Sequence, residues 1–300
     1  MLVMKTTYRM MGIADYITLA NGLLGAVAIL MLTLAVEGLS DPFGGGMNDT
    51  YIWAAVLCII LSVIGDVIDG PIARRYSKVR ILGGSLDIMS DCLAFCVAPA
   101  LMMFVMFGRM GSASPFWTIV LSIACCWVIA TGMLRLARFA HEEGGYVPYF
   151  SGLSSPASSM LLMSLALFIW TQPSTGIGPG LSSWDCQPFC FGKGDDKPYY
   201  DFLILPFMLF AGGMMIADRK LPKLKRGWPM WSTVAQMLAL LLATLTMLIH
   251  LLLGGDSNSQ TVNRVVASLL LISFLLVMIY IIFGPSVVSK EEIASSAESE

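Results

Sequence analysis

Residues 51–69 read YIWAAVLCIILSVIGDVID, an apolar stretch that ends in two aspartates, Asp66 and Asp69. A helix needs about 20 apolar residues to cross the ~30 Å hydrocarbon core of a bilayer at ~1.5 Å per residue. The whole chain is 57% hydrophobic and only 13% charged, with a mean hydropathy of +0.77. No water-soluble fold buries that much apolar surface. The stretch is therefore predicted to be a transmembrane helix.

Other apolar stretches of similar length lie along the chain, separated by glycine, proline and charged residues. Together they predict an all-α, polytopic transmembrane helical bundle with about eight spans. We expect residues 1–289 to form a single membrane domain, followed by a polar tail, residues 290–300, that is disordered. The predicted spans are residues 13–36, 51–69, 84–107, 116–139, 155–171, 201–217, 229–253 and 262–283.

Basic residues divide unequally between the two sides of the predicted bundle. Loops rich in lysine and arginine stay on the cytoplasmic side of a membrane. With these spans, one side carries fourteen of the eighteen basic residues, so both termini are predicted to be cytoplasmic. The fourteen are Lys5, Arg9, Arg74, Arg75, Lys78, Arg80, Arg135, Arg138, Arg219, Lys220, Lys223, Lys225, Arg226 and Lys290.

Four aspartates stand at the adjoining ends of the second and third spans. Asp66 and Asp69 are three residues apart and Asp87 and Asp91 are four apart, so each pair shares one face of its helix. The second span runs toward the cytoplasm and the third returns, which brings the two pairs to the same depth. A central aspartate in a transmembrane helix costs ~2.5–3.5 kcal/mol on insertion scales. Four together therefore require a cation, a proton or a water-filled cavity.

A divalent cation is one way to compensate these carboxylates. Oxygen ligands at the mouth of a cytoplasmic cavity suit a hard ion such as Mg²⁺ or Mn²⁺, which bridges to substrate phosphates. An alternative is a cation-coupled transporter, in which the aspartates are an ion or proton site. A transporter is expected to place such carboxylates near mid-membrane on broken helices, whereas these lie near one face and are joined by a basic loop.

Residues 66–91, DVIDGPIARRYSKVRILGGSLDIMSD, resemble the signature of the CDP-alcohol phosphotransferase family. The signature is D-x-x-D-G-x-x-A-R, then eight residues, then G-x-x-x-D-x-x-x-D. Specified residues at fixed offsets over such a length make the resemblance specific. Every fixed position is matched, by Asp66, Asp69, Gly70, Ala73, Arg74, Gly83, Asp87 and Asp91.

The resemblance implies roles for the aspartates. Asp66, Asp69 and Asp87 bind the metal, Mg²⁺ or Mn²⁺, and Asp91 lies at the same metal site. Asp91 also acts as the general base toward the hydroxyl of the acceptor alcohol, provided that it lies within hydrogen-bond reach. The family resemblance further implies a homodimer, and no nucleic-acid partner is expected.

The same resemblance implies a binding site for a CDP-activated lipid. Gly70 and Ala73 are small there, so that the cytidine nucleotide can lie against the helix, Gly83 allows close approach, and Arg74 contacts the diphosphate. The first span carries YITLANGLLG, which is similar to the family's first helix, where Asn21 lines the nucleotide pocket. The alternative for Asn21 is a hydrogen bond that packs two helices together.

Residues 134–158, LRLARFAHEEGGYVPYFSGLSSPAS, resemble a segment of the family's phosphatidylserine synthases. Arg135 and Arg138, three residues apart at the cytoplasmic end of a span, are predicted to hold the serine carboxylate or a lipid phosphate. The alternative is that both arginines only flank the span. The favoured function is transfer from CDP-diacylglycerol or CDP-archaeol to L-serine, with release of CMP. Glycerol phosphate or inositol phosphate as acceptor is the alternative within the family.

The aspartates adjoin the basic loop between the second and third spans, so the active site is predicted to lie on the cytoplasmic face of the cell membrane. On the opposite side, the longest connection, residues 172–200, carries Cys186 and Cys190. Their spacing is compatible with a disulfide or with two free thiols. The last three predicted spans match no motif and are expected to complete the bundle or a dimer.

Overall fold

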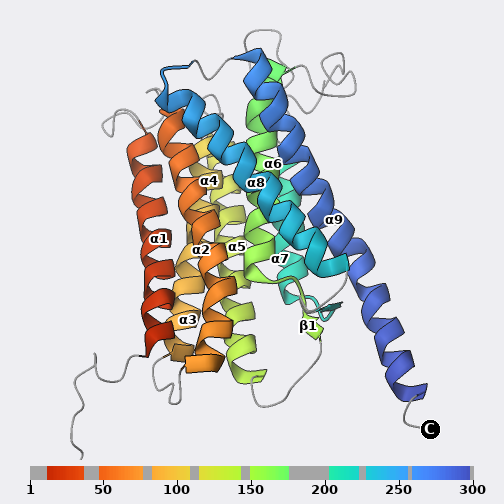
Figure 1. The fold of residues 1–300 in the computed structure, drawn as a ribbon. Helices are drawn as coiled ribbons and strands as arrows, with labels where there is room; N and C mark the ends of the chain where they lie inside the picture. Colours follow the sequence, from red (N-terminus) through yellow and green to blue (C-terminus); the bar gives the residue numbers. More distant parts are fainter. Residues whose placement is uncertain are drawn as a thin grey trace, which may run out of the picture.

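A computed structural model of the chain describes residues 12–36, 47–76, 83–108, 115–142, 149–175, 203–222, 228–255 and 259–297. These residues form a bundle of long helices that run up and down in turn (Figure 1). The helices are α1 (Ile13–Ala35), α2 (Asp49–Tyr76), α3 (Gly83–Asp91), α4 (Ala98–Phe107), α5 (Pro115–Glu142), α6 (Ser155–Thr175), α7 (Ile204–Ile216), α8 (Trp228–Leu252) and α9 (Gln260–Ala297). The first residue of α1 and the last of α9 lie at the same end, the lower end in Figure 1.

The predicted all-α transmembrane architecture is confirmed. A helix occupies the position of every predicted span, and six helical segments are long and apolar enough to cross a membrane. Two shorter apolar segments lie in α6, at Ser155–Thr171, and in α7, at Ile204–Ile216. The number of spans and the cytoplasmic placement of both termini stay predictions. Cys186 and Cys190 lie outside the described residues.

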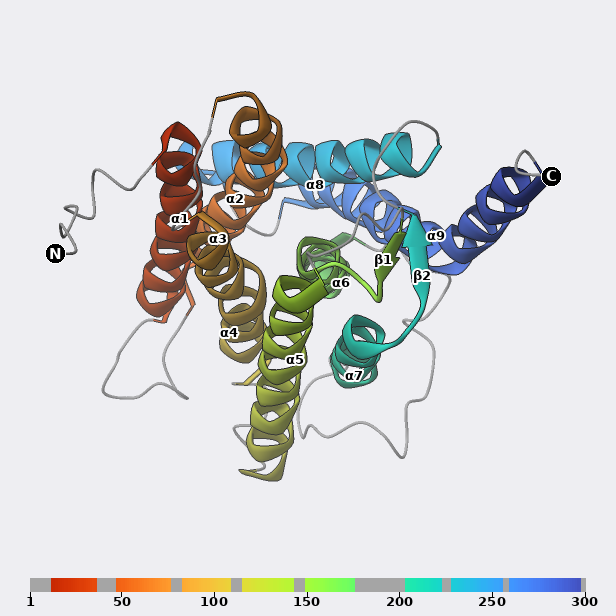
Figure 2. The ribbon, with the colours of Figure 1, turned by 90° about the horizontal axis from the view of Figure 1, so that it is seen from below.

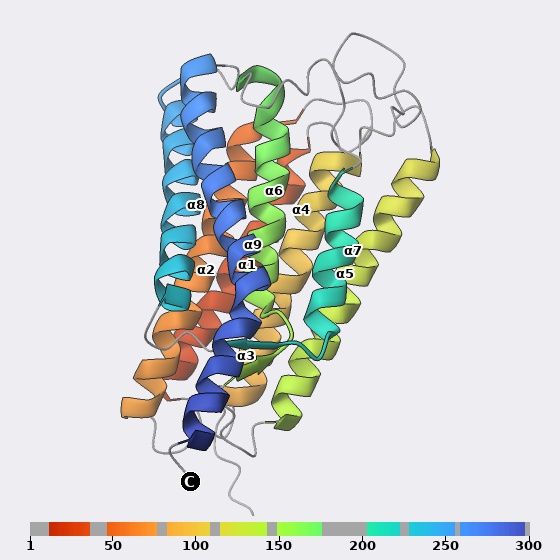
Figure 3. The same cartoon turned by 90° about the vertical axis from the view of Figure 1, so that its right-hand side faces the viewer.

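Helix α9 differs most from its predicted span. It continues past Pro285 to Ala297, so residues 290–297 are helical where the sequence predicts a disordered tail. Its last turns run beyond the rest of the packed interior toward the lower end (Figure 3). Extending an existing helix avoids the unfavourable nucleation step, and the lysine, glutamate and alanine residues of this stretch are good helix formers.

The third predicted span is one helical segment with a wider turn in its middle. Residues Cys92–Val97 form a π-helix, η2, between α3 and α4. Segment η2 packs closely on α1, because a Cβ atom at Gly25 would lie 2.8 Å from the Cα atom of Ala94. Short π-helical turns are frequent at functional sites. This one begins directly after Asp91.

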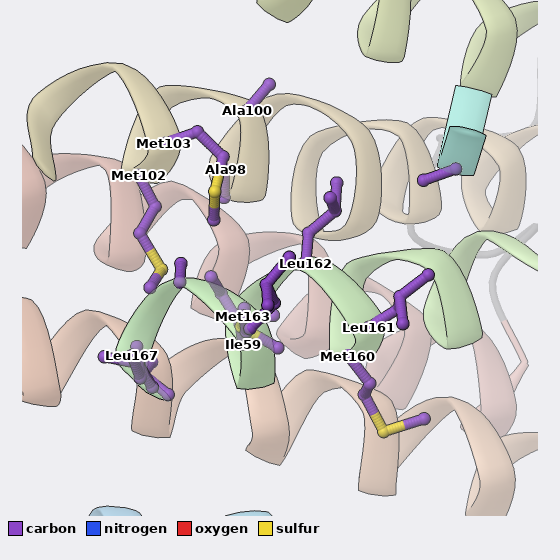
Figure 4. Packing of buried hydrophobic residues seen from close by; sticks show 14 of the residues in the cluster. Ile59, Ala98, Ala100, Met102, Met103, Met160, Leu161, Leu162, Met163 and Leu167 are labelled. Atoms are coloured by element: carbon purple, nitrogen blue, oxygen red, sulfur yellow. The ribbon is translucent and has the colours of Figure 1, made fainter. Parts of the chain in front are cut away.

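Methionine side chains fill much of the interior between α2, α4 and α6 (Figure 4). Met102 and Met103 of α4, Met160 and Met163 of α6, and Ile59 of α2 are all buried. Helices in a bilayer associate through close packing, because lipid tails are as apolar as the side chains themselves. Unbranched methionine fills irregular gaps between helices. The interior of the bundle above its lower end is therefore densely packed.

Two short strands lie at the lower end beside α9 (Figure 2). Strand β1 (Tyr149–Ser151) pairs antiparallel with β2 (Lys220–Pro222). The Tyr280 hydroxyl of α9 donates to the Pro222 carbonyl at 3.0 Å. Gly152 follows β1 with a φ of 76°, a conformation that favours glycine. Strand β1 belongs to residues 134–158, the segment in which the sequence predicts acceptor binding. This part of the segment is therefore fixed to α9 through β2.

Two adjacent glycines on α7 provide a test of the helix packing. A Cβ atom at Gly212 would collide with Nε1 of Trp127 on α5, whereas a Cβ at Gly213 meets no described atom within 4 Å. We expect Gly212→Ala to lower the free energy of unfolding by about 1–3 kcal/mol, because α5 must move. Gly213→Ala should leave it unchanged or raise it by up to ~1 kcal/mol. Thermal unfolding of both variants in one detergent checks this, and equal midpoints would contradict the packing.

Candidate active site

The four predicted aspartates lie toward the lower end of the bundle, on two helices that share α1 as a neighbour. Asp66 and Asp69 are in the second half of α2, and Asp87 and Asp91 are in α3. Helix α1 packs along both α2 and α3, whereas the main chains of α2 and α3 seldom come close to each other within the described residues. The relative position of the two aspartate pairs therefore depends on α1.

Three of the four carboxylates converge. One oxygen each from Asp66, Asp69 and Asp87 lies within 4.8 Å of the other two. Ligand oxygens around an octahedral ion are roughly 3–4 Å apart at bond lengths of ~2.1 Å, so small side-chain rotations bring all three onto one ion. Asp69 is only 4% exposed and the other two are partly buried, so their negative charge is poorly solvated. The donor set fits a hard divalent cation such as Mg²⁺ or Mn²⁺.

Asp91 is not a member of this group of three. It lies four residues after Asp87, about one helical turn further along the chain, and is partly buried. A carboxylate next to a metal site but outside the converging group keeps an oxygen for a proton. Its roles as general base and as a further metal ligand stay predictions.

Helix α1 contacts the group of three carboxylates through a buried threonine. Thr18 is 1% exposed, and its Oγ1 donates to Oδ2 of Asp69 at 2.8 Å. From α3, Ser90 Oγ donates to the Thr18 carbonyl at 2.8 Å. Sequence reasoning missed both residues. Asp15, Thr18 and Asn21 recur every three residues in a mostly apolar helix, and this polar face would have been the signal.

Asn21 lies at the contact between α1 and α2. It is buried, and its main-chain carbonyl accepts a hydrogen bond from Ser62 Oγ at 3.1 Å. Its side chain occupies the space in front of Gly65, where a Cβ atom would collide with Asn21 Oδ1. Asn21 thus packs between the two helices close to Asp66, through its main-chain carbonyl and through the space that Gly65 leaves for its side chain. Its part in lining a nucleotide pocket stays a prediction.

The predicted nucleotide-binding residues flank the connection between α2 and α3. Gly70, Ala73 and Arg74 belong to the last two turns of α2, and their side chains lie outside the described ones. Gly83 is the first residue of α3 and is buried. All four positions are therefore at the same end of the bundle as the aspartates, and their contacts with the nucleotide stay predictions.

Arg135, the first predicted acceptor residue, is buried near the aspartates. It lies on α5, is 9% exposed, and donates from Nη1 to Ser155 Oγ at 2.9 Å. Its guanidinium interacts electrostatically with Asp66 and Asp91. Nε of Arg135 has no hydrogen-bond partner within the described part of the chain. Ser155, which begins α6, belongs to the predicted acceptor segment but was not singled out by its sequence.

Arg138, the second predicted acceptor residue, lies in different surroundings. Its side chain is 42% exposed and forms a salt bridge with Asp218, at 2.5 Å between Nη1 and Oδ1. Asp218 lies just before β2 and is 82% exposed. An exposed ion pair of this kind contributes about 0–1 kcal/mol to stability. The structure therefore brings Arg135, but not Arg138, into the buried surroundings of the aspartates.

Comparison with known proteins places this site in a family. The chain is 28% identical to the CDP-diacylglycerol–serine O-phosphatidyltransferase of Saccharomyces cerevisiae over 224 residues, 72% of either chain. It is 30% identical to the protein of the same name from Methanocaldococcus jannaschii over 157 residues, 52% of this chain and 61% of that one. It is 27% identical to the archaetidylserine synthase of Methanothermobacter thermautotrophicus over 155 residues, 51% of this chain and 57% of that one.

The model of one protein family covers residues 11–186, more than half of the chain and all of α1, α2, α3 and α5. This range includes the four aspartates and the two arginines that the sequence predicts to bind the acceptor, Arg135 and Arg138. The chain belongs to the CDP-alcohol phosphatidyltransferase family.

Proposed function

We propose that the protein transfers a phosphatidyl or archaetidyl group from a CDP-activated lipid to L-serine and releases CMP. The family sets the type of reaction, and the names of the relatives support serine as the acceptor. The observation that carries the proposal is the convergence of Asp66, Asp69 and Asp87 on one point. Membership of a transferase family argues against the transporter alternative.

In this proposal Asp66, Asp69 and Asp87 would hold a divalent cation, Mg²⁺ or Mn²⁺, for binding of the CDP-lipid. When bound, such an ion neutralises the charge that develops on the leaving phosphate. The three carboxylates keep their positions because they lie on two helices, α2 and α3, that both pack on α1, with Asp69 fixed by Thr18 of α1. Fixed charges in a poorly solvated site act more strongly than charges in water.

Asp91 serves as the general base. The serine Oγ attacks the phosphorus that carries the lipid, and its proton passes to the Asp91 carboxylate. The bond from that phosphorus to the bridging oxygen breaks, and the oxygen leaves with CMP. The separation of Asp91 from the group of three supports this division of roles.

Arg135 is the better candidate for the serine carboxylate. Its guanidinium is buried, and Nε is left without a hydrogen-bond partner among the described residues. A carboxylate that accepts from a guanidinium forms a strong, charge-assisted hydrogen bond. Arg138 is engaged by Asp218, so its role is to hold the end of α5.

The lower end of the bundle faces the cytoplasm in this proposal. The predicted excess of basic residues on that side supports the orientation. The CDP-lipid then enters from the bilayer of the cell membrane, while serine comes from the cytosol. One relative is named for a CDP-diacylglycerol substrate and another for an archaetidylserine product, so the assay uses both CDP-diacylglycerol and CDP-archaeol. The homodimer stays a prediction, which native mass spectrometry checks.

Release of CMP by the purified protein in detergent tests the function. CDP-diacylglycerol and CDP-archaeol are each supplied with Mg²⁺ or Mn²⁺ and with L-serine, glycerol 3-phosphate or inositol 1-phosphate. We expect release that depends on serine, stops with EDTA and returns with excess metal, because the carboxylates need the ion to bind a diphosphate. Release only with a phosphorylated acceptor would contradict the serine assignment, and release unaffected by EDTA would contradict the metal site.

Asp91→Asn tests the general base. The amide cannot accept the serine proton, so we expect turnover to fall by about 10²–10⁴-fold while CDP-lipid binding persists. Asp49→Asn, at the far end of α2, removes the same charge away from the site and should leave turnover unchanged. Full activity of Asp91→Asn in the CMP assay would remove Asp91 from this role.

Arg135→Ala and Arg138→Ala form a matched pair on one helix. A hydrogen bond to a charged group contributes about 1.5–3 kcal/mol, so loss of Arg135 should raise the KM for serine at least ~10-fold. The KM for CDP-lipid should change little. Loss of Arg138 should leave both KM values within about threefold of the wild-type values, because an exposed ion pair contributes little. Equal effects of the two substitutions on the serine KM would refute the assignment.

A further inference from the structure

Helix α1 contributes none of the three converging carboxylates, yet it contacts both helices that do. Thr18 Oγ1 lies 2.8 Å from Asp69 Oδ2 on α2 and 3.1 Å from the Ala14 carbonyl. A hydroxyl has one proton, so it donates to one acceptor at a time. The carboxylate is both the nearer acceptor and the charged one, and charge-assisted hydrogen bonds are the stronger. The proton of Thr18 therefore goes mainly to Asp69.

The main chain of the same residue connects to α3. Ser90 is buried, and its Oγ donates to the Thr18 carbonyl at 2.8 Å. Ser90 is three residues after Asp87 and directly before Asp91. A Cβ atom at Gly22 would lie 2.7 Å from Ser90 Oγ, so the close approach of α1 and α3 depends on a glycine here. Thr18 thus links the helix of Asp69 to the helix of Asp87.

This link matters because the main chains of α2 and α3 seldom come close to each other within the described residues. Negative charges on Asp66, Asp69 and Asp87 repel one another in a poorly solvated site. The repulsion pushes the carboxylates apart unless another group holds them. A donor on Oδ2 of Asp69 restrains the position of that carboxylate against the repulsion.

We propose that Thr18 is a positioning residue for the metal site: its side chain orients Asp69, and its carbonyl fixes α3 and so Asp87. The inference rests on the proposed function, because it assumes that the three carboxylates bind a divalent cation. Loss of a hydrogen-bond partner behind a metal ligand typically weakens metal affinity by 10–100-fold. Thr18 should therefore set metal affinity without touching the metal or the substrates.

The test is Mn²⁺ binding to the purified full-length protein without substrates, followed by electron paramagnetic resonance. Thr18→Val keeps the branched shape and removes the hydroxyl, and Thr18→Ser keeps the hydroxyl. Thr244→Val is the matched control, because Thr244 is fully buried on α8 and its Oγ1 donates to the Leu240 carbonyl at 2.8 Å. We expect the Mn²⁺ Kd to rise about 10–100-fold in Thr18→Val and to stay within about threefold in the other two variants.

The outcomes distinguish the proposed metal site from the positioning role of Thr18. Wild-type protein that binds no Mn²⁺, or binds it equally well after Asp69→Asn, would overturn the metal site and with it the proposed function. Wild-type binding with an unchanged Kd in Thr18→Val would overturn the positioning role alone. If Thr18→Val does not fold, Ser90→Ala decides: it breaks only the bond to α3, so a raised Kd supports the link and an unchanged Kd contradicts it.

Discussion

Repulsion between three carboxylates is the constraint around which the lower end is built. At 4.8 Å and an effective dielectric constant of about 20, two unit charges repel by on the order of 3 kcal/mol. Water relieves little of this at Asp69, which is 4% exposed. A bound divalent cation would offset this repulsion, and the hydrogen bond from Thr18 holds one of the carboxylates. The buried Arg135 adds a further positive charge near Asp66 and Asp91.

The rest of the bundle supports this arrangement from a distance. The methionine-rich interior holds α2, α4 and α6 together above the site. Because the described main chains of α2 and α3 seldom come close to each other and both pack on α1, α1 acts as the common support for both aspartate pairs. On the other side of Arg135, the strand pair and Tyr280 fix the start of α6 to α9. The site is therefore assembled from the first three helices, with α5 and α6 closing it.

Much of the site could be predicted because it depends on local spacing. Aspartates three or four residues apart share a helical face, and a short connection brings the ends of neighbouring helices together. The eight helical positions followed from apolar length alone. The resemblance then supplied roles that spacing cannot, and the matching family model agrees with it.

What could not be predicted depends on how the helices pack. Thr18 and Asp69 are 51 positions apart, and Arg138 and Asp218 are 80 apart. Ile59 is buried in α2 whereas Ile68 is 48% exposed, although the two side chains are identical. In a membrane, buried and lipid-facing surfaces are equally apolar, so hydropathy does not say which face meets which helix. The helical end of α9 was missed because a polar composition alone indicated disorder.

The most direct measurement is a structure of the protein with Mn²⁺, recorded with anomalous scattering at the manganese edge. We expect one strong anomalous peak about 2–2.3 Å from an oxygen of each of Asp66, Asp69 and Asp87. A manganese ion bound elsewhere, or a peak that contacts none of these three carboxylates, would contradict the metal site on which the proposed chemistry depends.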